Sequence, residues 1–133
     1  MSILLDTHVL LWALSDPERM PAWAVDELSD PSVEVFFSAV CVWEIAIKAA
    51  HRRAEFTWNP YLARQDALAV GFRELPIDGL TAARVVTLPP IHRDPFDRFL
   101  VAQAMETGHT LYTADRIVAS YPGPIRLVGT GPG

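Results

Sequence analysis

The sequence predicts an α/β protein: a three-layer α/β/α sandwich with a central, mainly parallel sheet of about four to five strands. Short apolar or β-branched runs alternate along the chain with longer segments of helical pattern, and several of those segments begin or end at capping residues. The 133 residues, half of them hydrophobic, suit one domain with a single core. Because we find no repeat, low-complexity tract or linker, we expect a single domain over 1–129 and a flexible tail over 130–133.

The first half of the chain carries two strand signals, each followed by a helix. The apolar run Ile3–Leu5 is too short for a helix and predicts the first strand. It ends at Asp6-Thr7, and either side chain can cap a helix over His8–Leu14. The β-branched and aromatic run Val35–Phe37 predicts the second strand. The other helices expected in this half are Pro21–Leu28 and the helix after the second strand, which carries Glu44.

The second half contains the clearest helix signal. Asp94 at the cap position and Pro95 at the first helical position open a helix over Phe96–Thr107, and Gly108 stops it. The other helices expected here are Asn59–Val70, Gly79–Thr87 and Ala114–Ser120. The expected strands are Leu75–Ile77, Leu111–Thr113 and Ile125–Val128.

Composition and charge narrow the class of protein. The net charge of −5 leaves no basic footprint over the whole surface, so any nucleic-acid contact has to be local, through clustered arginines. The lone Cys41 rules out an internal disulfide and fits a reducing compartment. No apolar run is long enough to span a bilayer, and the apolar N-terminus lacks a basic leader. We therefore expect a cytoplasmic protein.

Acidic residues stand where an α/β sheet places its functional crevice, beyond the carboxyl ends of the strands. Asp6 follows the first strand directly, and Asp115 comes two residues after the strand Leu111–Thr113. Asp97 lies in the first turn of one helix and Glu44 in the second turn of another. In a doubly wound sheet all four carboxylates can converge on one edge.

Each acid also has a purely structural explanation. Asp6 can cap a helix, Asp97 can interact with the helix dipole, and Asp115 can be a solvated turn residue. Glu44 can form a helical ion pair with Lys48 at i+4, worth about a few tenths of a kcal/mol.

The surroundings of Glu44 favour a cleft over open solvent. On a helical wheel for SAVCVWEIAIK and the residues after it, Cys41, Glu44, Lys48 and His51 lie along one side. That polar stripe is narrower than the polar face of an ordinary surface helix, because apolar side chains occupy the remainder.

Together the four acids indicate a hard divalent cation. Converging carboxylates raise one another's pKa unless a cation compensates their charge. Oxygen ligands without a His or Cys at metal spacing suit Mg²⁺ or Mn²⁺, and zinc fits poorly. The chain has no Gly-rich phosphate loop, no GxSxG and no CxxC. The chemistry that remains is metal-assisted hydrolysis.

Four motifs carry a family resemblance. The segments ILLDTHVLLW, SAVCVWEIAIK, HRDPFDRFLVAQA and LYTADR resemble, in this order, the PIN-domain ribonucleases, in particular the VapC toxins of VapBC toxin–antitoxin pairs. They span most of the chain.

The resemblance implies a PIN-like sandwich and a Mg²⁺-dependent endoribonuclease, with Mn²⁺ as an alternative ion. It implies that the catalytic, metal-binding residues are Asp6, Glu44, Asp97 and Asp115. It also implies supporting hydrogen bonds from Thr7 and Thr113. The implied reaction is hydrolysis of an RNA phosphodiester by a metal-activated water. The implied partners are RNA, a cognate VapB-type antitoxin and a second copy of the chain.

Basic residues near the acids are candidates for the RNA path. A guanidinium matches phosphate oxygens, which favours Arg98 and Arg116, and Lys48 lies one turn from Glu44. Both arginines can equally pair with neighbouring acids or with solvent. The further candidates are Arg93, Arg52, Arg53 and His92, of which we expect His92 to be structural.

Two other functions compete with the nuclease. A receiver-like phosphotransfer domain needs paired acids after the first strand and a late lysine, whereas Asp6 precedes Thr7 and the only lysine is Lys48. That hypothesis fails on spacing. A catalytically silent PIN-like module that binds RNA or protein remains open.

Overall fold

The computed structural model describes residues 1–51 and 57–129 and contains one parallel sheet of five strands. The strands are β1 (Ser2–Leu5), β2 (Glu34–Ser38), β3 (Arg73–Leu75), β4 (Thr110–Thr113) and β5 (Ile125–Leu127). They lie in the order β3-β2-β1-β4-β5, and every adjacent pair is parallel. The predicted parallel sheet is therefore confirmed.

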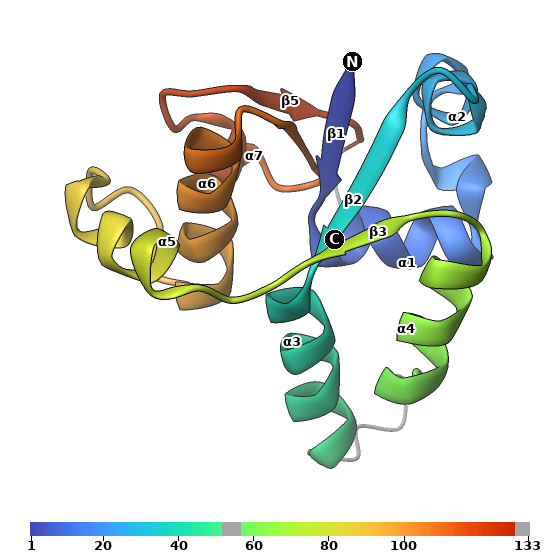
Figure 1. Cartoon of the computed structure of the whole chain (residues 1–133), viewed down its shortest axis with the longest axis horizontal. Coiled ribbons are helices and arrows are strands. Elements are labelled where there is room, and N and C mark those ends of the chain that lie inside the picture. Colours follow the sequence, from blue (N-terminus) through green and yellow to red (C-terminus); the bar gives the residue numbers. More distant parts are fainter. Residues whose placement is uncertain (52–56, 130–133) are drawn as a thin grey trace.

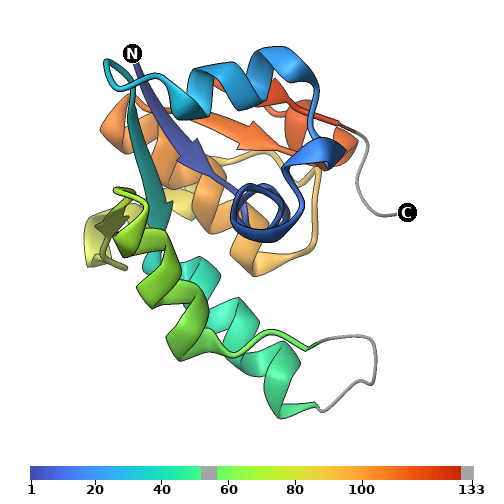
Figure 2. The ribbon, with the colours of Figure 1, turned by 90° about the vertical axis from the view of Figure 1, so that its right-hand side faces the viewer.

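Helices cover both faces of this sheet. They are α1 (Thr7–Ser15), α2 (Ala22–Ser29), α3 (Ala39–Ala50), α4 (Pro60–Ala69), α5 (Gly79–Arg84), α6 (Pro95–Thr107) and α7 (Arg116–Ala119). Short 3₁₀ turns follow α1 at Pro17–Arg19 and α5 at Val85–Thr87. Helices α1 and α2 lie on one side of the sheet, and α5 and α6 lie on the other (Figure 1). Helices α3 and α4 pack against each other, and the view turned by 90° shows that this pair extends beyond the sheet (Figure 2).

The strand order creates a switch point beside β1. The chain adds β2 and then β3 on one side of β1, and crosses back to place β4 and β5 on the other. In open parallel sheets such a reversal leaves a crevice at the carboxyl ends of the two strands that flank it. Here those strands are β1 and β4, which Asp6 and Asp115 follow.

The core fills the space between the sheet and its helices. Leu4 of β1, Phe37 of β2 and Tyr112 of β4 are fully buried, as are Leu10 of α1 and Leu100 of α6. Because β1 is the central strand and is covered on both faces, its residues 3–5 are all apolar. The turn that follows β1 is therefore held by a rigid layer.

The third strand lies two residues earlier than predicted, at Arg73–Leu75 instead of Leu75–Ile77. The register with β2 pairs Arg73 with Phe36 and Leu75 with Ser38, and Pro76 follows at once. Proline has no N–H to continue the ladder, so the strand ends there.

The predicted last helix, Ala114–Ser120, is also shorter in the structure. Asp115 caps it through its side chain, so that helical backbone begins at Arg116. Within the residues that the structure describes, no helix has the length and apolar character needed to cross a membrane. The predicted tail, 130–133, lies outside the described residues.

Replacing Leu100 by alanine is expected to lower the free energy of unfolding by about 2–5 kcal/mol, because its side chain is 1% exposed and its loss leaves a cavity. The matched control is Leu80→Ala on α5, where the side chain is 70% exposed and the change should stay within about 0.5 kcal/mol. Urea unfolding measures both, and equal losses would contradict the assigned core.

Candidate active site

Asp6 is buried at the end of β1 and is held by three donors. Its Oδ1 accepts a hydrogen bond from the Val9 amide at 2.8 Å. Its Oδ2 accepts from the Thr113 hydroxyl at 2.7 Å and from the Ala114 amide at 3.1 Å. The side chain therefore caps α1 and also ties β1 to the turn after β4. Burial is the largest influence on its pKa and raises it, although the three hydrogen bonds act in the opposite direction.

Glu44 projects from α3 with both carboxylate oxygens engaged. The Thr7 hydroxyl donates to Oε1 at 2.6 Å, and Lys48 Nζ lies 3.2 Å from Oε2. Thr7 follows Asp6 directly, so the start of α1 links the two acids. The polar stripe of α3 runs from the buried Cys41 and Glu44 to the half-exposed Lys48 and the exposed His51. The predicted ion pair thus exists, and Glu44 is nevertheless buried.

Asp97 carries a strongly perturbed carboxylate. It lies in the first turn of α6, beside the Asp94 side chain that caps this helix through the Phe96 and Asp97 amides. The pKa of Asp97 is raised to about 8. Burial is the main cause, followed by the charges of Asp94, Asp6, Glu44 and Asp115. Four surrounding carboxylates make ionisation of this group unfavourable unless a cation is present.

Asp115 belongs to the turn between β4 and α7. Its Oδ1 accepts from the Ile117 amide at 2.7 Å, which caps α7, and its Oδ2 lies 3.1 Å from His92 Nε2. Burial acts to raise its pKa, but the hydrogen bonds from His92 and the α7 backbone outweigh that effect and lower it. Asp115 therefore ionises more readily than Asp97, whose pKa is raised.

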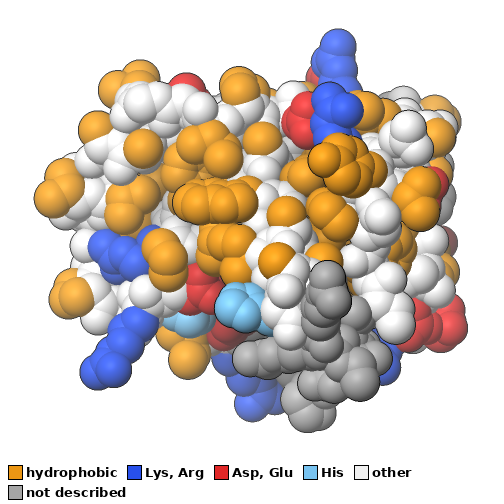
Figure 3. Space-filling view, turned by 90° about the horizontal axis from the view of Figure 1, so that it is seen from below, with side chains coloured by type: hydrophobic (Ala, Val, Ile, Leu, Met, Phe, Trp, Pro, Cys, Tyr) orange, Lys and Arg blue, Asp and Glu red, His pale blue; other side chains and the backbone are white. Residues whose placement is uncertain are grey.

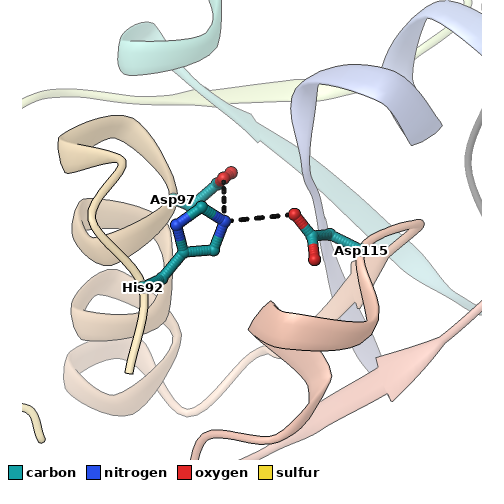
Figure 4. Close-up of side chains that lie close together, drawn as sticks. All are labelled: His92, Asp97 and Asp115. Atoms are coloured by element: carbon teal, nitrogen blue, oxygen red, sulfur yellow. Dashed lines mark hydrogen bonds and ion pairs between the residues drawn. The ribbon is translucent and has the colours of Figure 1, made fainter. Parts of the chain in front are cut away.

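His92 joins Asp97 to Asp115. Its Nε2 lies 3.2 Å from Asp97 Oδ2 and 3.1 Å from Asp115 Oδ2, so that this corner of the ring faces both carboxylates (Figure 4). One ligand atom from each of these three residues lies within 4.8 Å of the others. Asp6 and Glu44 do not belong to this tight group and reach Asp97 through their charge. From the sequence, His92 is a further candidate for the RNA path with a structural role favoured, and its contact with these two acids is not predicted; its place two residues before the α6 cap was the available signal.

The Arg98 side chain has a structural role. Its guanidinium donates to the carbonyls of Pro89 at 3.0 Å and Val85 at 3.2 Å, and to the Tyr121 hydroxyl at 3.0 Å. These bonds hold the loop before α6, and they use the donors that the phosphate hypothesis required. By contrast, the side chain of Arg116 is exposed.

The remaining basic candidates divide by position. Arg93 is exposed, and the Lys48 side chain is 38% exposed beside Glu44. Arg52 and Arg53 lie outside the described residues.

The donor set fits a hard divalent cation. The acids offer carboxylate oxygens, and burial raises the pKa of both Asp6 and Asp97, to which the charges of four neighbouring carboxylates add at Asp97. Cys41 does not make this a zinc site, because burial raises the pKa of its thiol to about 12 and its Sγ lies 3.7 Å from the Leu5 carbonyl oxygen. The residues present therefore suit Mg²⁺ or Mn²⁺.

The Asp97→Asn variant is expected to be more stable than the wild type in EDTA at pH 8, by about 1 kcal/mol or more. Between pH 4 and pH 8 the folded wild type retains a proton that the unfolded chain has lost, because the folded pKa is about 8. Its free energy of unfolding therefore falls as pH rises through this window, and the asparagine removes that slope. Urea unfolding at pH 5 to 8 measures it, with Asp26→Asn, at an exposed position of α2, as the control for the substitution. Parallel pH slopes for wild type and Asp97→Asn would contradict the account.

Comparison with known proteins agrees with the sequence motifs. A family model described as "PIN domain" matches residues 3–124. Ribonuclease VapC22 of Mycobacterium tuberculosis is 32% identical over 124 residues, which cover 92% of this chain and 94% of that protein.

Solved structures share the fold. VapBC2 from Rickettsia felis, bound to a DNA fragment from its promoter, matches with a TM-score of 0.69 at 12% identity, over 96% of this chain and 98% of that one. DNA-bound VapBC from Salmonella typhimurium matches with a TM-score of 0.65 at 19% identity, over 98% and 99% of the two chains. The resemblance inferred from the motifs is confirmed, and the chain belongs to the PIN-domain family.

Proposed function

We propose that this chain is a Mg²⁺- or Mn²⁺-dependent endoribonuclease that acts as the toxin of a type II toxin–antitoxin pair. The observation that carries the proposal is the convergence of acids from four different elements at the switch point, around an Asp97 whose pKa is raised to about 8. The similarity to Ribonuclease VapC22 supports RNA as the substrate.

The chain's own residues prepare the site for in-line hydrolysis. Asp6, Glu44 and Asp97 would hold the ion, with Asp115 beside them, and the hydroxyls of Thr7 and Thr113 orient Glu44 and Asp6. Such an ion supplies activated water for attack on the phosphodiester and offsets the charge that develops on the phosphate. None of these side chains acts as a covalent nucleophile.

The RNA path is expected to follow exposed cations beside the acids. Arg116 adjoins Asp115, Arg93 adjoins the α6 cap, and Lys48 lies one turn beyond Glu44. Because the chain is acidic as a whole, these local charges would provide the phosphate contacts. Arg98 is left out of this set because its guanidinium holds the loop before α6.

A VapB-type antitoxin and a second copy of the chain are the proposed partners, in the cytoplasm. The solved structures with the same fold include VapBC complexes. An apolar hollow of about 620 Å³ lies between α3 and α4, where Trp43 is 55% and Tyr61 80% exposed. Hydrophobic side chains also gather over the centre of the face shown in Figure 3, with acidic and histidine side chains beside them. Apolar surface of this kind is typical of protein interfaces.

Purified protein free of antitoxin should cut total RNA into defined fragments with Mg²⁺ and leave it intact in EDTA. Asp6→Asn and Glu44→Gln each remove a carboxylate from the cluster, so each is expected to reduce cleavage by on the order of 100-fold or more. Gel analysis of the fragments measures this.

The matched controls for cleavage are Asp26→Asn and Glu18→Gln, which make the same chemical changes at exposed positions of α2 and the first 3₁₀ turn. They should cut like the wild type. Folded wild-type protein that cuts no RNA above the Asp6 and Glu44 variants would favour the silent binding module.

Arg116→Ala is expected to impair RNA binding, whereas Arg98→Ala is expected to impair stability. In EDTA, Arg116→Ala should weaken RNA binding, reduce the salt slope by about 0.7, and leave stability within about 0.5 kcal/mol. Arg98→Ala should lower the free energy of unfolding by about 1–3 kcal/mol, because partly buried acceptors lose their donor. Filter binding across a salt series and urea unfolding separate the two, with Arg19→Ala as the binding control. A normal salt slope for Arg116→Ala would remove it from the RNA path.

A further inference from the structure

The backbone fixes the protonation of the His92 ring. The Asp94 amide N–H donates to His92 Nδ1 at 3.0 Å. An amide N–H is always a donor, so Nδ1 must be the bare nitrogen that accepts, and the ring proton must lie on Nε2. That Nε2 donates to Asp115 Oδ2 at 3.1 Å and lies 3.2 Å from Asp97 Oδ2 (Figure 4). The Asp94 amide and the Asp115 carboxylate thus select the same tautomer.

The loop that carries His92 is also held in place. The His92 amide donates to the Tyr121 hydroxyl at 2.7 Å, and Arg98 donates to the same hydroxyl at 3.0 Å and to the Pro89 carbonyl at 3.0 Å. The ring itself is largely buried, with 16% of the side chain exposed. A donor fixed by backbone, tyrosine and arginine has little freedom to turn away from the two acids.

We propose that His92 is a positioning residue: its Nε2–H holds the carboxylates of Asp97 and Asp115 in register, and the ring is neither a metal ligand nor a general base. This inference rests on the proposed metal-dependent function. A nitrogen that carries the proton has no free lone pair, so it can neither ligate an ion nor accept a proton. His92 therefore acts on the site only through the two acids it contacts.

This arrangement leaves the acids able to bind a cation. A carboxylate has about four acceptor positions, so Asp115 can accept from His92 and still offer oxygen lone pairs to an ion, and Asp97, which Nε2 faces at 3.2 Å, keeps its own lone pairs as well. A neutral donor also adds no positive charge that would repel the ion. Without it, the two carboxylates would turn apart or take up protons, and both changes compete with metal binding.

Two substitutions test the roles of the two ring nitrogens separately. In His92→Gln the amide nitrogen takes the place of Nε2 and preserves the donor toward Asp97 and Asp115. In His92→Asn the amide oxygen takes the place of Nδ1, preserves the acceptor for the Asp94 amide, and removes that donor. We expect Mn²⁺ affinity, measured by EPR on the full chain without RNA, to fall by about 10- to 100-fold in His92→Asn and by no more than about threefold in His92→Gln.

Nitrogen-15 NMR of the wild-type imidazole tests the same inference without a variant. The chemical shifts should show a protonated Nε2 and an unprotonated Nδ1, both before and after Mg²⁺ is added. Loss of the Nε2 proton on Mg²⁺ addition, with equal affinity losses in both variants, would make His92 a ligand and overturn the inference. Affinities within about threefold of the wild type in both variants would also overturn it. Wild-type protein that binds no Mn²⁺ would overturn the proposed function, and this inference with it.

Discussion

The site depends on holding several carboxylates close together in a place that water only partly reaches. Asp6 and Glu44 are buried, Asp97 is mostly buried, and the pKa of Asp97 is raised to about 8 by burial and by its acidic neighbours. Lys48 is the only lysine of the chain and pairs with Glu44. Mutual repulsion of this kind destabilises the folded protein at neutral pH, and a divalent cation removes it. The same feature that opposes folding would therefore favour binding of the proposed metal ion.

The fold tolerates this cluster because fixed donors hold three of its acids. Asp6 receives two backbone amides and a hydroxyl, Glu44 receives Thr7, and Asp115 receives His92, whose Nε2 also lies 3.2 Å from Asp97. These donors come from elements that the parallel sheet aligns, namely the turns after β1 and β4 and the starts of α1 and α6. Because residues 3–5 of the central strand are completely buried, the turns cannot drift apart. The geometry of the site is thus a consequence of the strand order.

The features that could be predicted from the sequence are those that residue type and local position determine. The cap at Asp94 and the acids after β1 and β4 follow from residue type and position, and the structure has these elements where they were predicted. The third strand was misplaced, because its bounds depend on pairing with β2 and on Pro76. The bonds of Arg98 to Pro89 and Tyr121, and of His92 to Asp115, join segments that only the tertiary fold brings together. No spacing in the sequence encodes such contacts.

The most direct test of a divalent-cation site at the switch point is anomalous scattering from a crystal soaked in Mn²⁺. The account predicts a manganese peak bound by carboxylate oxygens of the Asp6, Glu44 and Asp97 cluster, with His92 Nε2 outside its coordination shell. An empty cluster at saturating Mn²⁺, or a manganese ion bonded to His92 Nε2, would contradict it.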